Sequence, residues 1–210
     1  KILMQVFPIN PVDCKDYIVN VHYAHRMPPI EVAFGMYVDK VLRGVCTFST
    51  PASRFSMRPE PYELNRLVID EGMPKNTLSR FLSICLKKFP HNPAIIVSYA
   101  DPNYGHQGYI YQATNWIYNG LSNGRKTFYI NNVELHERTI YDKYGTTSVP
   151  ALQEMGLDVR TEANLPKHRY FYLIGDKRFK KSVEIESFSY PKGDNKRYEL
   201  KKSNPQMILF

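Results

Sequence analysis

The sequence predicts a mixed α/β domain with an extension, and three observations lead to this. The chain has 210 residues, which suits one domain of generous size or one domain with an extension. Runs with the period-2 pattern of β-strands alternate with runs of helical periodicity, without repeats or low-complexity tracts. In the middle of the chain a strand, a polar loop and a capped helix occur twice in succession, as is typical of an α/β domain.

Strands are expected where alternating or continuous apolar runs are bounded by turn residues. They cover residues 2–9, 31–38, 41–49, 62–69, 94–100, 126–130 and 168–174. The second and third are separated by Asp39-Lys40 alone, which predicts an antiparallel hairpin.

Helices are expected between these strands, at residues 12–22, 77–89, about 105–118 and 149–155. The first begins with Asn10 as its cap and Pro11 at its first position, and Pro28-Pro29 stops it. The third closes at Asn119-Gly120. The second presents one apolar face, made of Leu78, Phe81, Leu82 and Cys85.

Cysteine usage and hydropathy exclude several classes of protein. Cys14, Cys46 and Cys85 are odd in number and far apart, which argues against a disulfide framework or a zinc knuckle. No run of about 18 apolar residues occurs, and the opening residues 1–7 are too short for a signal segment. We therefore expect a soluble protein of a reducing cytoplasm with no membrane partner. Because the chain begins at Lys1 rather than Met, we also expect residues upstream of it.

A formal charge of +8 and a pI near 9.3 favour a polyanionic partner. Most of the excess lies late in the chain: residues 160–210 carry 12 Lys or Arg against 6 Asp or Glu, a net of +6. Aromatic residues are interleaved with these charges at residues 169–172, 178–181 and 188–192, a pattern that suits nucleic acid. The alternative is a strand with buried aromatics and a solvated basic edge.

A specific resemblance rests on the segment Val97 to Trp116, which reads VSYADPNYGHQGYIYQATNW. Together with HYAHRMP at 22–28, ELNRL at 63–67 and KHRY at 167–170, it resembles the Mom family of phage DNA adenine-modification proteins over most of residues 15–175. The resemblance implies a carbamoylmethyl-type addition at adenine N6 that protects phage DNA from host restriction. It also implies a GNAT-like fold and a dependence on iron.

The order of the expected elements resembles the GNAT acyltransferase fold, in which the fourth and fifth strands splay apart to admit a pantetheine arm. We expect a GNAT-like catalytic domain at residues 1–175 and a basic C-terminal extension at 176–210, packed on the same domain. An acyl-type donor is implied, with acetyl-CoA as one candidate, although the loop before the second helix offers only Gly72 where GNAT loops have several glycines. The residues assigned to the donor are Arg66, Lys75, Asn76, Thr77 and Arg80; a solvated helix start is the alternative for the last four.

The chemistry expected at adenine is demanding. The N6 lone pair is delocalised into the ring, and inside a duplex the amine is unreachable unless the base is flipped out. Tyr111 is our preferred general acid, by analogy with the tyrosine on this helix in GNAT enzymes, and Tyr109 is the second choice. Tyr111, Asn115 and Tyr118 would share one helix face toward the substrate. Ordinary core packing is the alternative for these tyrosines.

Ser98 and Asp101 lie at the carboxyl end of a central strand, where ligands bind in open α/β sheets. Asp101 is expected to accept a hydrogen bond from the adenine amine or to act as a base, or else to cap the next helix. Ser98 is expected to orient donor or substrate, or else to be a satisfied strand hydroxyl.

The cluster His22-Tyr23-Ala24-His25-Arg26 precedes Pro28, where the chain bends. His22 and His25 with Asp101 or His106 would suit non-haem iron. Catalytic contact by His22 and Tyr23 without a metal, and a purely structural cluster, are the alternatives.

The prediction is thus an enzyme of the phage-infected bacterial cytoplasm that transfers a group to DNA adenine. DNA contacts are assigned to Arg26, Asn115, Tyr118, Arg125, Lys180 and Lys181, with Arg54 and Arg58 as further phosphate contacts. The alternatives are an N-acetyltransferase acting on a small amine or protein, and a non-catalytic DNA-binding protein of the same fold. A homodimer is kept open.

Overall fold

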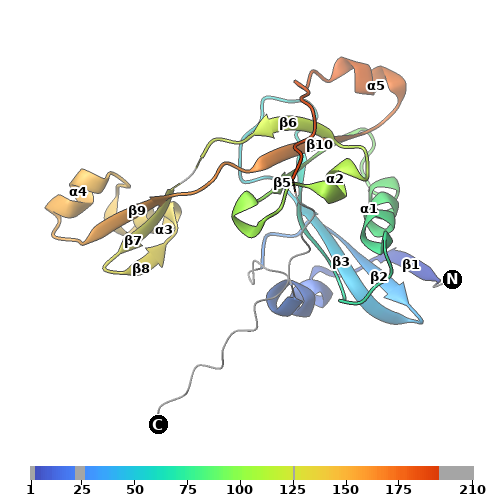
Figure 1. Cartoon of the computed structure of the whole chain (residues 1–210), viewed down its shortest axis with the longest axis horizontal. Helices are drawn as coiled ribbons and strands as arrows, with labels where there is room; N and C mark the ends of the chain where they lie inside the picture. Colours follow the sequence, from blue (N-terminus) through green and yellow to red (C-terminus); the bar gives the residue numbers. More distant parts are fainter. Residues whose placement is uncertain (1–2, 22–26, 125, 194–210) are drawn as a thin grey trace, which may run out of the picture.

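The structure is a computed structural model that describes residues 3–21, 27–124 and 126–193. Its main sheet has the strand order β1-β2-β3-β4-β5-β10-β6 (Figure 1). All neighbours are antiparallel except β4 and β5, so the predicted mixed sheet is confirmed. The strands are β1 (Met4–Pro8), β2 (Val32–Val38), β3 (Val41–Ser49), β4 (Tyr62–Ile69), β5 (Ala94–Ala100), β10 (His168–Ile174) and β6 (Ile117–Leu121).

The central strands β4 and β5 part soon after they meet. They pair in parallel only at Tyr62↔Ile96 and Glu63↔Val97, and then diverge. A β-bulge in β4 falls at the same place, because Leu64 and Arg66 pair with neighbouring residues of β3 and leave Asn65 as the extra residue. The splayed central strands expected from the sequence are therefore present.

Both faces of the sheet are covered by apolar side chains. On one face, α1 (Thr77–Lys87) buries Phe81 and Leu82 against Phe34 and Phe48 of the hairpin. This confirms the predicted apolar helix face, which follows from the spacing of three to four residues between its members. The predicted hairpin β2–β3 is also confirmed, and its turn residues Asp39 and Lys40 have positive φ of 49° and 64°.

The opposite face is covered by the segment after β1. Residues 11–21 form helical turns rather than the regular α-helix that was predicted: a 3₁₀ turn η1 (Pro11–Cys14) and a π-type turn η2 (Tyr17–Val21). The predicted cap is present, since the Asn10 side chain accepts a hydrogen bond from the Val12 amide. Cys14 and Ile18 pack on Val45 of the sheet, and this packing has prevailed over regular helical geometry.

The predicted helix from about 105 to 118 is wrong. A 3₁₀ turn η3 (Pro102–Tyr104) leads to α2, which covers only Tyr109–Gln112, and Asn115 then adopts a positive φ of 60°. The chain reverses there so that Trp116 enters the core and Ile117 and Tyr118 pair with β10. Strand pairing and burial of the indole have thus prevailed over local helical periodicity.

A second, three-stranded sheet lies between β6 and β10 in the chain and stands apart from the main sheet (Figure 1). It has the order β8-β7-β9, made of β7 (Lys126–Ile130), β8 (Val133–Leu135) and β9 (Val159–Ala163), with α3 (Glu137–Tyr144) and α4 (Val149–Glu154). It has its own small core, which includes Phe128, Ile140 and Leu152. The sequence predicted β7 and α4 but not this separate sheet.

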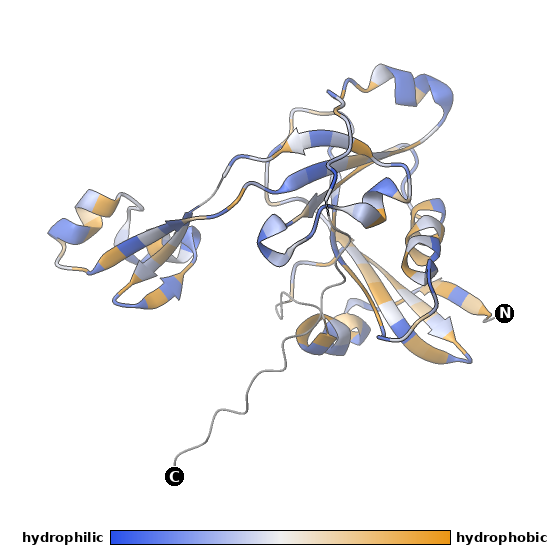
Figure 2. Ribbon diagram, viewed as in Figure 1, coloured by the Kyte–Doolittle hydropathy of each residue, from blue (hydrophilic) through white to orange (hydrophobic). Residues whose placement is uncertain are grey.

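The C-terminal segment returns over the edge of the main sheet. Helix α5 (Lys177–Ser182) follows β10, begins at an Asp176 cap and is largely hydrophilic (Figure 2). Residues 183–193 then run along β6 and α2. There the Phe188 amide donates to the Tyr118 carbonyl at 2.9 Å, and the Tyr190 hydroxyl donates to the Trp116 carbonyl at 2.6 Å. Among the helices of the described residues, none is long and apolar enough to span a bilayer.

Candidate active site in the cleft between the splayed strands

A cleft of about 1450 Å³ opens where β4 and β5 part. Its walls are β4 and the loop after it, the end of β5, and the loop that leads from Asp101 to α2. The segments that join the second sheet to the main sheet, which we call its stem, form part of the rim through Ser122, Asn123, Thr127, Asn164, Leu165 and Lys167. Beyond Glu63 no strand among the described residues pairs with this edge of β4, which borders the cleft. The first two carbonyls there accept side-chain hydrogen bonds, Leu64 from Ser98 and Asn65 from Arg66, so a bound molecule can pair with the β4 backbone only past these two residues.

The buried end of the cleft holds a pair of hydroxyl groups. Ser98 Oγ lies 2.7 Å from the Tyr111 hydroxyl and 2.8 Å from the carbonyl oxygen of Leu64, just past the last pairing of β4 with β5. A serine hydroxyl has one proton and a carbonyl only accepts, so with both bonds formed Ser98 donates to Leu64 and Tyr111 donates to Ser98. Both side chains line the cleft, so Ser98 and Tyr111, which were predicted separately as catalytic residues, lie in contact.

Tyr111 is held by the aromatic rings around it. Its ring centroid lies 5.0 Å from that of Trp116 and 5.1 Å from that of Tyr170. Tyr170 is fully buried, and its hydroxyl donates to the Gln107 carbonyl at 2.5 Å, which ties the loop before α2 to β10. Burial raises the pKa of Tyr170 to about 12. The hydroxyl of Tyr111 is therefore presented from a rigid support.

Asp101 is almost fully buried, with 6% of its surface exposed, and both of its carboxylate oxygens are engaged. One accepts from the backbone and side-chain amides of Asn103 at 3.0 and 2.8 Å, and the other lies 2.8 Å from Lys167 Nζ. Burial pushes the pKa of Asp101 upward, but Lys167 and the Asn103 donors outweigh it, so the pKa is lowered. Asp101 thus caps η3 and fixes Lys167, a use that competes with its predicted role as a base.

His106 lines the cleft one turn beyond Asp101. Its backbone amide donates to the Asp101 carbonyl at 3.2 Å, which places the ring beside that residue. Burial lowers the pKa of His106, and the Asp101 carboxylate only partly opposes this. The imidazole is therefore neutral at pH 7 and can accept a proton.

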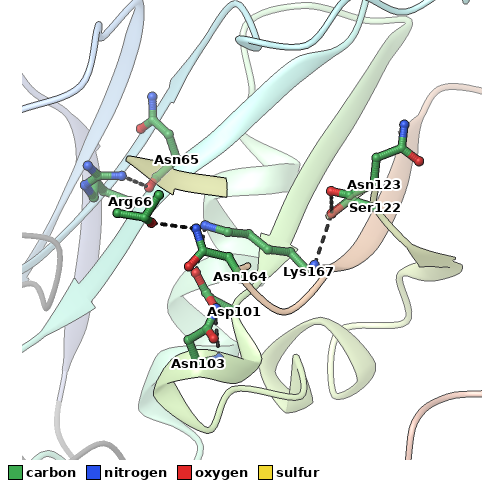
Figure 3. A network of polar contacts seen from close by, with 9 residues as sticks. Asn65, Arg66, Asp101, Asn103, Ser122, Asn123, Asn164 and Lys167 are labelled. Atoms are coloured by element: carbon green, nitrogen blue, oxygen red, sulfur yellow. Dashed lines mark hydrogen bonds and ion pairs between the residues drawn. The ribbon is translucent and has the colours of Figure 1, made fainter. Parts of the chain in front are cut away.

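A polar network joins the cleft to the stem of the second sheet (Figure 3). Lys167 reaches Asp101 with its side chain, while its backbone amide donates to Ser122 Oγ at 3.0 Å. Asn164 donates from Nδ2 to Thr127 Oγ1 at 2.8 Å. Arg66, from the bulged part of β4, also lines the cleft and donates to the Asn65 carbonyl at 2.7 Å (Figure 3).

The residues predicted to bind the donor divide into two groups. Arg66 lines the cleft. Lys75, Asn76, Thr77 and Arg80 do not; they surround the start of α1, where Asn76 has a φ of 66° and makes no side-chain cap bond. Gly72 and Leu78 of the same loop and helix do line it, so the helix start borders the cleft although its polar side chains lie outside the lining.

The predicted substrate face of Tyr111, Asn115 and Tyr118 does not exist, because α2 ends before Asn115. Asn115 is exposed, and Tyr118 lies on β6, outside the cleft lining, where its hydroxyl meets His168 Nδ1 at 2.8 Å. Tyr109 does line the cleft, but its hydroxyl donates to the Gly193 carbonyl.

The basic residues assigned to DNA lie in several places. Arg54 lines the cleft, whereas Arg58 is exposed and paired with Glu60 at 3.3 Å. Lys180 and Lys181 are exposed on α5. They follow the end of β10 that pairs with Ala94, while the cleft lies at the other end of that strand, beside Ala100. About 20 Å of strand separates the two ends.

Five predicted residues, His22, Tyr23, His25, Arg26 and Arg125, lie outside the described residues. Among the residues that are described, no three His, Cys, Asp or Glu side chains gather in a way that could hold a metal ion. Asp101, the third predicted ligand, is committed to Lys167 and Asn103. The iron expected from the resemblance has no support in this part of the chain.

Three residues of the cleft, Lys167, Arg169 and His106, were not given their roles from the sequence. Lys167 and Arg169 stood in a quoted motif, but no local pattern indicates that a segment 66 residues after Asp101 returns to it. His106 was considered only as a metal ligand, and its neutral state follows from burial that the sequence does not reveal.

Comparison with known proteins gives a family and a distant structural likeness. The model of the Mom protein family matches residues 4–192. No curated protein matches the chain in sequence. Similar solved structures include a GNAT-family acetyltransferase from Bacillus cereus ATCC 10987 (13% identity, TM-score 0.45, covering 82% of this chain and 98% of that one). Another is an N-acetyltransferase from Staphylococcus aureus Mu50 (12% identity, TM-score 0.45, covering 81% and 97%). Likenesses this distant do not bear on the reaction.

Proposed function

Because the chain belongs to the Mom protein family, we propose that it is a transferase that adds a carbamoylmethyl-type group to N6 of adenine in DNA. The observation that carries the proposal is the Tyr111–Ser98 hydroxyl pair at the buried end of a cleft that also holds the neutral His106. The lining of the cleft thus includes a proton donor and a proton acceptor, which substitution by a weakly nucleophilic amine requires.

In the proposed reaction a bond forms between adenine N6 and the donor's methylene carbon, and the bond from that carbon to its leaving atom breaks. His106 accepts the proton that N6 loses. Tyr111 turns its proton from Ser98 to the leaving atom and gives it up. Before the transfer, Ser98 holds the Tyr111 oxygen in place while its own proton is bonded to the Leu64 carbonyl. Asp101 remains ionised and keeps Lys167 at the rim.

The donor in this proposal is an acyl-type molecule that carries its leaving atom on the methylene carbon next to the amide carbonyl. Acetyl-CoA, the candidate named from the sequence, has its leaving sulfur on the carbonyl carbon, so it fits only the alternative reaction, N-acetylation of an amine. The part of β4 from Leu67 to Ile69, which lines the cleft past the carbonyls bonded by Ser98 and Arg66, suits an extended arm with amide groups, because such an arm can pair with strand backbone. The loop after β4 suits a diphosphate less well. Asp70 and Glu71 place two carboxylates at the lining, although Asp70 is bound by Arg43 at 3.0 Å, and the nearby cations Lys75 and Arg80 lie outside the lining. The donor's nucleotide end is therefore not part of the proposal.

DNA is the proposed acceptor, and basic residues at the cleft are proposed to hold its phosphates. Arg54, Lys167 and Arg169 reach the lining from two separate segments. Phosphate contacts of this kind position a duplex without reading its sequence. The adenine must leave the stack to bring N6 to Tyr111, since a base inside a duplex cannot reach a buried hydroxyl.

Mass analysis of nucleosides tests the proposal. Plasmid DNA from bacteria that express the chain is digested to nucleosides and compared with DNA from bacteria that express Tyr111→Phe. A deoxyadenosine heavier by a carbamoylmethyl group, reduced in the variant, is the expected result, together with resistance of the plasmid to restriction enzymes that cut at adenine-containing sites. Unaltered nucleosides from DNA that nevertheless binds the protein would instead indicate a non-catalytic DNA-binding protein.

A further inference from the structure

Leu165 is an exposed apolar side chain at the rim of the cleft. It has 55% of its surface exposed and belongs to the cleft lining. A single exposed leucine is ordinary on a protein surface and carries no meaning alone. For Leu165 three further observations point to a function: the support of its segment, its position at the cleft and the cations next to it.

The segment that carries Leu165 is braced on both sides. Asn164 donates to Thr127. The Lys167 backbone amide donates to Ser122 Oγ at 3.0 Å, and the Ser122 amide donates to the Lys167 carbonyl at 2.8 Å. Pro166 restricts the backbone on both sides of its own nitrogen. A side chain built on Gly124 would lie 3.6 Å from the Asn164 carbonyl, so the two stem segments run in close contact. Leu165 is thus held out from a rigid base.

Cations stand next to Leu165 on the same segment. Lys167 and Arg169 both line the cleft, and Lys167 is half exposed although it pairs with Asp101. Arg54 and the half-exposed Tyr104 line the cleft from two other loops. An apolar tip with cations close by is the arrangement that enters a stack of bases while the neighbouring phosphates are neutralised.

We propose that Leu165 is the wedge that enters the DNA stack and occupies the space left by the adenine when it turns into the cleft. This inference rests on the proposed function and names the residue that makes it work on duplex DNA. A base that leaves the stack loses contact on both its faces, and an apolar side chain in the gap restores part of that contact to its former neighbours. The wedge acts as a positioning residue, since it touches the duplex and not the reacting atoms.

Leu165→Ala tests the wedge, and Leu121→Ala is its matched control. Leu121 has 54% of its surface exposed, lies on β6 near the same stem and is not in the cleft lining. The substrates are oligonucleotides copied from a site that the wild-type protein modifies in plasmid DNA: a perfect duplex, a duplex with an abasic position opposite the target adenine, and the single strand. Leu165→Ala is expected to slow modification of the perfect duplex about 10-fold, because unstacking is no longer offset. The single strand and the abasic duplex should be modified at the wild-type rate.

A second measurement needs no group transfer. With 2-aminopurine in place of the target adenine, the wild-type protein and Leu121→Ala are expected to raise the fluorescence of the duplex as the base unstacks, and Leu165→Ala should not. Wild-type rates and fluorescence for Leu165→Ala on the perfect duplex would overturn the wedge and leave the proposed function standing. An equal loss on duplex and single strand would also overturn it. If the wild-type protein modifies none of the three DNAs, the proposed function fails, and the wedge fails with it.

Discussion

At the scale of single residues, the Ser98 hydroxyl links the candidate chemistry to the architecture of the sheet. In a continuous sheet the Leu64 carbonyl would be paired by the backbone of β5, but the strands part at this point and Ser98 takes over the bond at 2.8 Å. Ser98 Oγ in turn accepts a hydrogen bond from the Tyr111 hydroxyl at 2.7 Å. The residue that stabilises the opening of the sheet therefore also orients the proposed acid.

Tyr111→Phe is expected to fold and to bind DNA while modifying adenine about 100-fold more slowly, because it keeps the ring packing and loses the donated proton. Tyr118→Phe is the matched control. Both tyrosines are 7% exposed and pack on Tyr170 at about the same centroid distance, 5.1 and 5.0 Å, but Tyr118 lies outside the cleft lining. The measurement is the single-turnover rate of modification. Equal losses in the two variants would mean that the effect is one of packing.

His106 predicts a pH dependence. Burial holds its pKa below the ordinary value of about 6.5, and a general base acts only when it is unprotonated. The rate should therefore be independent of pH near neutrality and should fall on acidification, with a midpoint below about 6.5. His106→Gln should be slower at every pH and should lack this acidic limb. A pH–rate profile of the variant that keeps the wild-type midpoint would remove His106 from the mechanism.

At the scale of elements, the loop from Asp101 to α2 is shaped by two glycines with left-handed backbone. Gly105 and Gly108 have φ of 73° and 80°. A Cβ on Gly105 would meet no atom within 4 Å, whereas on Gly108 it would lie 2.4 Å from the Tyr170 ring. The first glycine serves the turn alone, and the second also lets the loop lie flat on the fully buried Tyr170.

These two glycines form a pair for measuring the loop. Gly105→Ala should cost about 1–2 kcal/mol of folding free energy, which is the cost of a left-handed alanine. Gly108→Ala should cost about 2–4 kcal/mol, because the methyl group also displaces a buried ring. Urea unfolding measures both. Only Gly108→Ala should change the activity of the folded protein, since the Tyr170 ring supports Tyr111; equal effects of the two variants would contradict this coupling.

At the scale of the whole molecule, two basic surfaces of the described residues lie apart from each other. One is the cleft rim with Arg54 and Arg169, and the other is α5 with Lys180 and Lys181, at the opposite end of β10. The prediction from the sequence assigned DNA contact to the basic C-terminal portion and gave Arg54 as a further phosphate contact. In the fold, one basic surface lies beside the candidate chemistry and the other lies away from it.

Two double reversals separate the roles of these surfaces. Binding of DNA is expected to weaken as salt rises, because neutralised phosphates release counterions. Arg54→Glu with Arg169→Glu should lower both the affinity and the modification rate of short duplexes. Lys180→Glu with Lys181→Glu should lower the affinity for long duplexes and leave the rate at saturating DNA unchanged. Electrophoretic mobility shifts measure the affinity, and single-turnover assays measure the modification rate. If the affinity responds neither to salt nor to Arg54→Glu with Arg169→Glu, the cleft rim is not the DNA contact.

Local sequence patterns were enough to predict six of the seven strands of the main sheet, its hairpin, α1 and the family. These depend on alternation in the strands, the short Asp39-Lys40 turn, and apolar residues on one helix face. The sequence also indicated Ser98 and Asp101, because they lie at the end of a central strand, and Tyr111, by its resemblance to the helix tyrosine of GNAT enzymes. The second sheet had a local signal that was not used, the Asn131-Asn132 pair, whose positive φ values of 50° and 64° form the turn between β7 and β8.

Three features depend on the tertiary structure: the length of α2, the ion pair of Asp101 with Lys167, and the position of Lys180 and Lys181 away from the cleft. Local periodicity predicts a helix through Tyr118. Instead, Tyr118 pairs with Tyr170 of β10 and Trp116 is buried in the core, and these contacts override the local helical preference. Asp101 reads as a free carboxylate until Lys167 returns to it across the stem of the second sheet. These outcomes depend on contacts between residues about 50 or more positions apart, and local sequence patterns do not predict such contacts.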